Sequence, residues 1–451
     1  MAVYRTKSIR SVTSIAEAFP FGSRISIAVV EYEKDIACSS VMAECYAVEN
    51  RTIKKAYTND TGKHSDKVCN GRYVILELSI TDEDASLVFT EGDKGRESMP
   101  GQEKIGQGPK GPGGPGGPGG PGGPGGHSKG QGPHITTVCV QAENRVVVRQ
   151  IASVNAADGS EICAENESIA SSHGIRQVVD DFRQYLFEDK KGSIPYSLYL
   201  PADRKEKLPL VMFVADASVQ GDDPLIALLQ GNGATSFACP EWQSRHRCIV
   251  AVPQIPKNMH VTSDQETGGT GVLPELLVGI ARQVISEYRA DDTRVYMTGQ
   301  SLGCIAAFAL NIMYPGFFAA SYMVAGQWHK TEDLLSIAHQ KMFMINSDGD
   351  MGAYPGMNKA AEAIAEGGGK VERFLLNAKW EKERQEQVLK PSLDTEANVV
   401  YATFTDTSVV PEGVDNNPIS NHMNTWPAAY DLDTPKEWLF SQKNNNSTGG
   451  K

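Results

Sequence analysis

The sequence predicts an all-β domain with an immunoglobulin-like sandwich, followed by an α/β domain built on a mostly parallel sheet. Three observations support this prediction. Short runs with apolar residues at every second position fill the first third of the chain, apolar strand candidates alternate with helix candidates in the rest, and a Gly-x-Ser-x-Gly turn joins one such strand to a helix. A length of 451 residues also exceeds the usual size of one domain.

The composition argues against two classes of partner. The chain has 43 lysine and arginine residues against 55 aspartate and glutamate residues, which gives a net charge of −12. Nucleic acids and anionic membranes attract basic surfaces, so we expect neither as a partner. No run reaches the roughly 18 apolar residues that a membrane-spanning helix needs, so we expect a soluble protein.

The amino-terminal residues and the cysteines predict the compartment. Residues 1–21 contain basic side chains but no continuous apolar stretch of a signal peptide, so we expect an uncleaved, cytoplasmic chain, or a secreted one if a signal peptide has been removed. The eight cysteines form no CxxC pair and no cluster with histidine at zinc spacing. We therefore expect buried free thiols and neither a metal nor a cofactor.

The first domain is predicted to span residues 1–160. Its strand candidates have β-branched and aromatic residues at period two, with turn residues between them, as antiparallel strands do. They are Arg24–Tyr32, Val41–Glu49, Thr52–Asp60, Gly71–Ile80, Ile135–Gln141 and Arg145–Val154. A Gly/Pro-rich segment with a PGG repeat, residues 92–133, interrupts them, and we interpret it as a flexible loop within the domain.

The second domain is predicted to span residues 175–443, and residues 444–451 a disordered tail. Near-continuous apolar strands separated by helices imply a parallel sheet covered on both faces. The strand candidates are Pro195–Pro201, Leu208–Ser218, Arg247–Gln254, Arg294–Gly303, Phe318–Gly326 and Lys341–Asp350. The helix candidates are Val272–Arg289, Cys304–Pro315 and Pro355–Gly368.

The turn Gly299-Gln300-Ser301-Leu302-Gly303 is the clearest chemical signal. It follows a strand and precedes a helix of small residues, which is the context of a nucleophile elbow. Glycines two positions before and after the serine permit a sharp turn that lifts its hydroxyl above the sheet. We therefore predict that Ser301 is a nucleophile.

A serine nucleophile needs a histidine base and a carboxylate that orients it, and in this type of domain they follow in the order serine, acid, histidine. His329 and His339 precede the best acid candidates, whereas His422 follows all of them in a polar loop. We predict His422 as the base. Asp348 and Asp350 both lie on the turn beyond a strand, and the residues alone leave the choice of acid open.

The developing oxyanion needs two backbone donors. The amide after the nucleophile, at Leu302, is one candidate. The other is expected in the turn after the strand that contains LPLVMFV, where we choose Ala217.

With these residues in place, the chain resembles two-domain bacterial esterases that have an N-terminal immunoglobulin-like domain before an α/β-hydrolase domain of the polyhydroxybutyrate-depolymerase and prolyl-oligopeptidase type. The motifs that carry the resemblance are IPYSLYLP with LPLVMFV, then RVYMTGQSLG, and NHMNTWPAAYD with EWLF. The resemblance implies Ser301 as nucleophile, Asp350 as acid and His422 as base. It also implies that the first domain forms oligomer contacts or borders the active site.

The chain departs from this family at one turn. The usual leucine-histidine-glycine after the early strand is here Val214-Ala215-Asp216. Because an oxyanion donor is a backbone amide, this change puts the geometry of the turn in question more than the activity.

These observations predict a serine esterase that acts on a small-molecule ester through an acyl-enzyme. A serine peptidase or amidase, and a catalytically degenerate binding protein, are the alternatives. Gln300 and Trp328 are candidate substrate contacts, although a packed core aromatic would explain Trp328 equally well.

Overall fold

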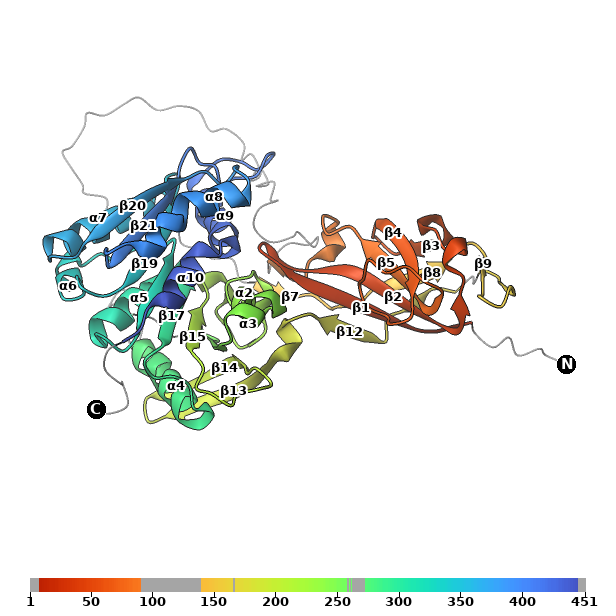
Figure 1. Ribbon diagram of the computed structural model, residues 1–451, viewed down its shortest axis with the longest axis horizontal. Coiled ribbons are helices and arrows are strands. Elements are labelled where there is room, and N and C mark those ends of the chain that lie inside the picture. Colours follow the sequence, from red (N-terminus) through yellow and green to blue (C-terminus); the bar gives the residue numbers. More distant parts are fainter. Residues whose placement is uncertain are drawn as a thin grey trace, which may run out of the picture.

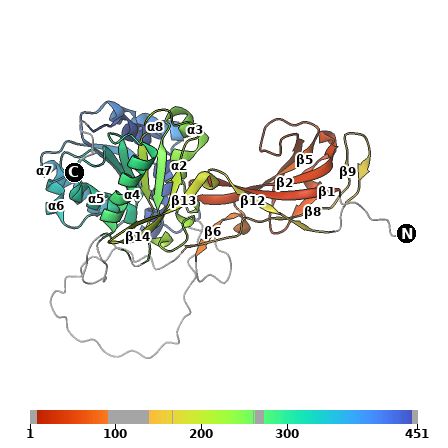
Figure 2. The ribbon, with the colours of Figure 1, turned by 90° about the horizontal axis from the view of Figure 1, so that it is seen from below.

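The computed structural model describes residues 8–90, 139–164, 167–257, 259, 261 and 272–444. Two domains lie side by side along the long axis of the molecule (Figure 1). The view from below shows the long strands of the first domain extending to the edge of the second (Figure 2). The predicted insertion, residues 92–133, lies outside the described residues.

The first domain is a sandwich of short sheets. Its larger sheet has the order β12-β1-β2-β5-β4, a second has the order β11-β8-β3, and β10-β9 and β6-β7 form two-stranded ribbons. The bounds are β1 Ile9–Phe19, β2 Gly22–Ile36, β3 Tyr46–Val48, β4 Ile53–Asn59, β5 Gly71–Leu78, β6 Val88–Thr90, β7 Cys139–Gln141, β8 Val147–Gln150, β9 Val154–Asn155, β10 Glu161–Ile162, β11 Ile169–Ala170 and β12 His173–Arg176.

The long first hairpin was only half predicted. β2 was expected from Arg24 onward, but β1 was not expected at all, although it pairs with β2 along its whole length. β1 interleaves Arg10, Ser11 and Glu17 with its apolar residues, and this hides the alternation on which a strand prediction depends. The expected strand Val41–Glu49 is also shorter, because a 3-10 turn at Ala43–Cys45 occupies its first part and β3 begins only at Tyr46.

The change of domain comes later in the chain than predicted. The stretch between residues 160 and 175 was expected to link the domains, but β11 pairs with β8 and β12 pairs in parallel with β1 as far as Arg176. These strands have only two and four residues, too few to show a periodic pattern. The sheet of the second domain begins with β13 at Phe182.

The second domain contains a nine-stranded sheet of order β13-β14-β16-β15-β17-β18-β19-β21-β20. Only the pairs that involve β14 are antiparallel, as the prediction of a mostly parallel sheet requires. The bounds are β13 Phe182–Asp189, β14 Gly192–Tyr199, β15 Leu210–Val214, β16 Ile249–Pro253, β17 Val295–Gln300, β18 Ala320–Val324, β19 Met342–Ser347, β20 Val371–Leu376 and β21 Val399–Phe404.

Helices cover both faces of this sheet (Figure 1). Alternate residues of β17 belong to different cores: Val295 and Met297 pack with α4, α5 and α7, whereas Tyr296 packs with α9 and α10. The bounds are α1 Ile226–Leu229, α2 Thr235–Ala238, α3 Pro240–Arg245, α4 Leu273–Tyr288, α5 Leu302–Met313, α6 Thr331–Leu335, α7 Ala353–Glu366, α8 Lys382–Leu389, α9 Pro418–Asp431 and α10 Thr434–Ser441.

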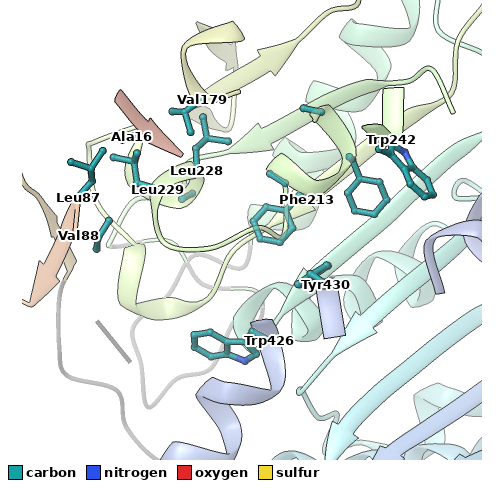
Figure 3. Close-up of a cluster of buried hydrophobic side chains, with 14 of the residues drawn as sticks. Ala16, Leu87, Val88, Val179, Phe213, Leu228, Leu229, Trp242, Trp426 and Tyr430 are labelled. Carbon is teal, nitrogen blue, oxygen red and sulfur yellow. The ribbon is translucent and has the colours of Figure 1, made fainter. Parts of the chain in front are cut away.

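One of the two cores continues into the first domain. Leu87, Val88 and Ala16 of the first domain lie beside Leu228 and Leu229 of α1 in a single buried cluster (Figure 3). All five side chains are at most 2% exposed. A continuous apolar interface of this kind fixes the relative position of two domains.

Three further features concern the termini, the cysteines and the helices. Asn444, which was expected to begin a disordered tail, donates its backbone N–H to the carbonyl oxygen of Thr293. The eight cysteines are free thiols, and Cys163 is exposed. Among the described residues, no helix has the length and apolar character needed to cross a membrane.

Candidate active site

The candidate nucleophile lies at a sharp turn between a strand and a helix. Ser301 follows β17 directly and immediately precedes α5. Its backbone has φ 51° and ψ −111°, a conformation that residues other than glycine rarely adopt. Strain at this position is typical of a nucleophile elbow, where it exposes the hydroxyl above the sheet.

Two glycines let α5 approach the neighbouring strand β15. A Cβ atom on Gly303 would lie 1.8 Å from the carbonyl oxygen of Val214, and one on Gly299 would lie 2.6 Å from the same oxygen. Both contacts are far shorter than van der Waals distance, so neither position accepts a side chain. The Gly-x-Ser-x-Gly spacing therefore has a steric cause in this chain.

The candidate base lies on a helix, which corrects the predicted polar loop. His422 belongs to α9 and is 7% exposed. A capping box begins this helix: the Asn417 side chain accepts the backbone N–H of Ser420, and the Ser420 hydroxyl accepts the backbone N–H of Asn417. Pro418 occupies the first helical position.

The carboxylate partner of His422 comes from the turn after β19. Oδ2 of Asp350 lies 2.5 Å from Nδ1 of His422. Its other oxygen accepts the backbone amides of Gly352 and Ala353, at 3.0 and 2.9 Å, where α7 begins. Because a helix N-terminus favours negative charge and both oxygens are engaged, this buried carboxylate is held in one orientation.

The alternative acid, Asp348, stabilises a different turn. Its carboxylate oxygens accept the backbone amides of Asp406 and Thr407, at 2.8 and 3.0 Å. Both of these residues have positive φ, 58° and 49°, so the turn after β21 is strained and depends on this support. Of the two aspartates that the sequence left open, the structure brings Asp350 to the histidine.

Ser301, His422 and Asp350 form a continuous hydrogen-bonded chain. Oγ of Ser301 lies 2.9 Å from Nε2 of His422, whose Nδ1 faces Asp350. A carboxylate can only accept, so Nδ1 carries the proton and Nε2 of the neutral ring accepts from the serine hydroxyl. This arrangement can pass the serine proton to the histidine while the carboxylate stabilises the imidazolium.

Trp426 fixes the plane of the histidine ring. It lies one helical turn after His422 on α9, and the two rings meet edge to face with centroids 5.3 Å apart and planes at 79°. The indole is 4% exposed, so it is anchored in the core. The spacing His-x-x-x-Trp in the sequence corresponds to this contact.

A buried polar network holds the turn after β15. Asp216, where the resembling family has glycine, is 1% exposed. One of its oxygens accepts the backbone N–H and the hydroxyl of Ser218, and the other accepts the side-chain amide of Gln300 at 2.9 Å. Gln230 and Cys139 both donate to the Ser218 hydroxyl. The network ties the turn to the residue before the nucleophile and to β7 of the first domain.

The two candidate oxyanion donors each begin a helical turn. Leu302 is the first residue of α5, and Ala217 is the first residue of a short 3-10 helix, Ala217–Val219. The first amides of a helix have no partner within it, so helical bonding leaves both N–H groups free to bind an anion. The turn that contains Ala217 lies against the elbow, because a Cβ on Gly303 would also approach the carbonyl oxygen of Ala215.

The other residues singled out in the sequence have structural partners or lie at the surface. Gln300 is buried and uses its amide in the network around Asp216, so it supports the turn. The indole N–H of Trp328 donates to Asp333 at 3.3 Å, and its half-buried ring lies 6.3 Å from that of Phe308. His329 and His339 are exposed.

Comparison with known proteins identifies the first domain. Residues 11–162 match the family described as the esterase Ig-like N-terminal domain. The first domain is thus similar to this family, and we call it the esterase Ig-like domain below. The search of curated proteins gave no match to this chain.

Solved structures extend the similarity over both domains. A thermostable esterase aligns with a TM-score of 0.73 and 21% identity, over 96% of this chain and 100% of its own. The chain thus has the predicted fold, an Ig-like domain followed by an α/β-hydrolase domain. An acetyl xylan esterase from Aspergillus awamori aligns over 41% of this chain and 80% of its own, with 17% identity and a TM-score of 0.32. A puromycin-hydrolyzing peptidase from Mycobacterium tuberculosis aligns over 66% and 46%, with 13% identity and a TM-score of 0.38.

The esterase Ig-like domain brings the tip of its β1–β2 hairpin to this site. Pro20 and Phe21 line a small hollow together with Gln300 and Trp426. Gly22 has φ 110°, and a Cβ there would lie 3.0 Å from the carbonyl oxygen of the residue after α1, so glycine permits the close approach. Sequence reasoning missed this contact because it missed β1, although a Pro-Phe-Gly turn marks the hairpin.

The described residues offer no candidate metal centre. No group of three or more histidine, cysteine, aspartate or glutamate side chains in this part of the chain could hold an ion.

Proposed function

We propose that the protein is a serine hydrolase that cleaves carboxylic esters. The observation that supports this proposal is the hydrogen-bonded chain from Ser301 through His422 to Asp350, which starts at a strained elbow. The α/β-hydrolase fold and the esterase Ig-like domain agree with it.

In the first half of the reaction, Oγ of Ser301 attacks the ester carbonyl carbon while Nε2 of His422 takes the hydroxyl proton. The tetrahedral intermediate then collapses, the bond to the alcohol oxygen breaks, and the imidazolium returns the proton to the leaving alkoxide. The product is an alcohol and an acyl ester of Ser301. Asp350 stabilises the imidazolium throughout.

In the second half, His422 takes a proton from water, and the resulting hydroxide attacks the acyl carbon. Collapse breaks the bond to Oγ, and Ser301 regains its proton from the imidazolium. In both halves the amides of Leu302 and Ala217 would stabilise the negative oxygen. Each such donor contributes roughly 100- to 1000-fold in rate when it is aimed at the transition state.

The test is hydrolysis of p-nitrophenyl esters from acetate to laurate by the wild type and by Ser301→Ala. We expect turnover by the wild type and a fall of at least about 10⁴-fold in the variant, because the nucleophile is lost. The length of the best acyl chain would give the size of the acyl pocket. Equal rates in both proteins would overturn the assignment of Ser301.

Two further measurements distinguish this proposal from the alternative functions, a peptidase and a degenerate binding protein. A triad of this geometry can also attack amides, so p-nitroanilides with the same acyl groups are measured in parallel, and we expect no comparable turnover of them. Labelling of the wild type by a fluorophosphonate probe, with none of Ser301→Ala, would exclude a degenerate binding protein. Faster cleavage of the anilides would favour a peptidase instead.

A further inference from the structure

A large cleft separates the esterase Ig-like domain from the α/β-hydrolase domain next to the candidate active site. It encloses about 1120 Å³. One wall is formed by residues of the Ig-like domain, among them Phe21, Arg24 and Ile80, and the other by the segment 407–414 and the middle of α9. Its lining contains none of Ser301, His422 and Asp350.

Arg24 is the unusual residue of this lining. Its side chain is buried, at 4% exposure, and its Nε has no hydrogen-bond partner among the described residues. None of the carboxylates in the described part of the chain forms an ion pair with it. Among the described residues, its guanidinium group lies over the face of the Phe21 ring, with the central carbon 5.4 Å from the ring centroid. A buried cation without a counter-charge is costly, and structures rarely retain one without a use.

A second arginine with a buried side chain, Arg51 in the segment before β4, shows what a structural arginine looks like here. Arg51 donates from Nη2 to the carbonyl oxygens of Ile25 and Ser79, and its Nε lies 3.4 Å from Asp82. It therefore links β2 to the segment after β5 and has its own carboxylate, although its Nη1 has no hydrogen-bond partner among the described residues. Arg24 has neither, and burial together with the nearby charge of Arg51 lowers its pKa to about 10. It still carries its full charge at neutral pH.

The cleft shares two lining residues with a small hollow next to the candidate active site. Phe21 and Pro427 line both the cleft and the small hollow that contains Gln300 and Trp426. Pro427 is on the same helix as His422, about one and a half turns further on. These shared residues place the cleft beside the hollow that contains Gln300, the residue before Ser301.

We propose that Arg24 binds a carboxylate of the ester substrate in the interdomain cleft, so that the protein prefers esters that carry a second, anionic end. This inference rests on the proposed esterase function and specifies its substrate class. The planar guanidinium matches a carboxylate in shape and charge, and the bound anion supplies the missing counter-charge. Lys379 and Glu412 also line the cleft, but both are exposed and offset one another in charge.

The test compares mono-p-nitrophenyl esters of dicarboxylic acids, from succinate to sebacate, with neutral p-nitrophenyl esters of the same chain length. The ratio of kcat/KM for the anionic over the neutral ester is the measured quantity. For at least one chain length, we expect this ratio in the wild type to exceed the corresponding ratio of rate constants for hydrolysis of the same two esters by hydroxide in solution. In Arg24→Met we expect the ratio to fall at least about tenfold, chiefly because KM for the anionic ester rises. Arg24→Lys is expected to restore part of it.

Lys379→Met is the matched control, because it removes an exposed cation from the same cleft. Its ratio is expected to equal that of the wild type. Arg24→Met is expected to melt at the wild-type temperature or above, because it replaces an unpaired buried charge, and this excludes misfolding as the cause of a lower ratio. A wild-type ratio in Arg24→Met, or a loss in Lys379→Met alone, would overturn the proposal.

A binding measurement separates this proposal from the proposed function. Free dicarboxylates of the same lengths are titrated calorimetrically into Ser301→Ala and into the double variant with Arg24→Met. We expect binding to the first that is lost in the second. If the wild type hydrolysed no ester but this difference were found, the site would stand and the esterase assignment would fail. If neither protein bound any dicarboxylate, the site would be rejected.

Discussion

Two aspartates on one turn, two residues apart, have different tasks because of the atoms that reach them. Asp350 faces an imidazole nitrogen, whereas Asp348 faces two backbone amides of a strained turn. Both are acceptors of charge-assisted hydrogen bonds. Only Asp350 lies beside a group, His422, that takes up and returns a proton during the proposed reaction.

Substituting each aspartate by asparagine separates these tasks. In Asp350→Asn the ring of His422 loses the acceptor that fixes its tautomer, so we expect kcat on the best p-nitrophenyl ester to fall about 10⁴-fold. In Asp348→Asn one acceptor oxygen remains for two amides, so we expect a loss of about 1–3 kcal/mol in the free energy of unfolding and kcat within about fivefold of the wild type. Steady-state kinetics and urea titration measure the two quantities. The reverse pattern would assign the acid to Asp348.

Residue-scale prediction succeeded where chemistry dictates a local pattern. The elbow around Ser301 could be found because glycine is required on both sides of it, and His422 because the order of the triad left no other candidate. Arg24 could not be found, since in the sequence it is the first residue of an ordinary strand. Its burial without a partner depends on pairing with β1 and on the docking of a second domain.

At the scale of elements, two strands of the large sheet contain buried tyrosines in contrasting states. The hydroxyl of Tyr196 on β14 has no hydrogen-bond partner among the described residues, although the side chain is fully buried. The hydroxyl of Tyr296 on β17 donates to the carbonyl oxygens of Gln442, at 2.9 Å, and Phe440, at 3.3 Å. Burial raises the pKa of Tyr196 to about 12 and also raises that of Tyr296.

Phenylalanine at each position tests these contrasting states. We expect Tyr196→Phe to increase the free energy of unfolding at pH 7 by about 1 kcal/mol, because it removes an unpaired buried hydroxyl, and Tyr296→Phe to decrease it by about the same amount. In the unfolded chain the pKa of Tyr196 is near 10, so its folded pKa is raised. Its titration therefore leaves the free energy of unfolding unchanged below pH 10 and lowers that free energy as the pH rises from 10 to 12.

Urea titrations at pH 8 and pH 11 measure this dependence. The loss of stability between the two pH values is expected to be smaller in Tyr196→Phe than in the wild type. An equal loss in both proteins would contradict the raised pKa of this hydroxyl. A decrease in stability at pH 7 would show that the hydroxyl has a partner after all.

Element-scale prediction was incomplete in both domains: in the second it did not expect β13, β20 and β21. Six strands and three helices of the α/β domain were expected near their observed places, because buried parallel strands form continuous apolar runs. β1 was missed because polar residues alternate irregularly along it, and β11 and β12 because they are too short to be periodic. These strands form because they pair with strands that are distant in the sequence, so the local sequence alone does not predict them.

At the scale of the whole molecule, one hydrophobic core joins the two domains. It runs from the sandwich through α1 to α9 and α10, whereas a second, small cluster around Ile75, Ile27 and Tyr57 lies on the far face of the larger sheet of the Ig-like domain. Domains that share a continuous apolar core unfold together, while domains with polar interfaces often unfold separately. The cleft that contains Arg24 is therefore a fixed feature of the fold.

Cooperative unfolding of the two domains can be measured because the reporters are confined to one of them. All five tryptophans, Trp242, Trp328, Trp380, Trp426 and Trp438, lie in the α/β-hydrolase domain. Ile75→Ala truncates a fully buried side chain in the far cluster of the Ig-like domain, at a cost of about 2–5 kcal/mol. For a chain of this length we expect the midpoint of the tryptophan fluorescence transition to fall by roughly 2–5 °C, because the core transmits the loss. An unchanged tryptophan midpoint, with a separate earlier transition in calorimetry, would show instead that the Ig-like domain unfolds independently and that the cleft can open.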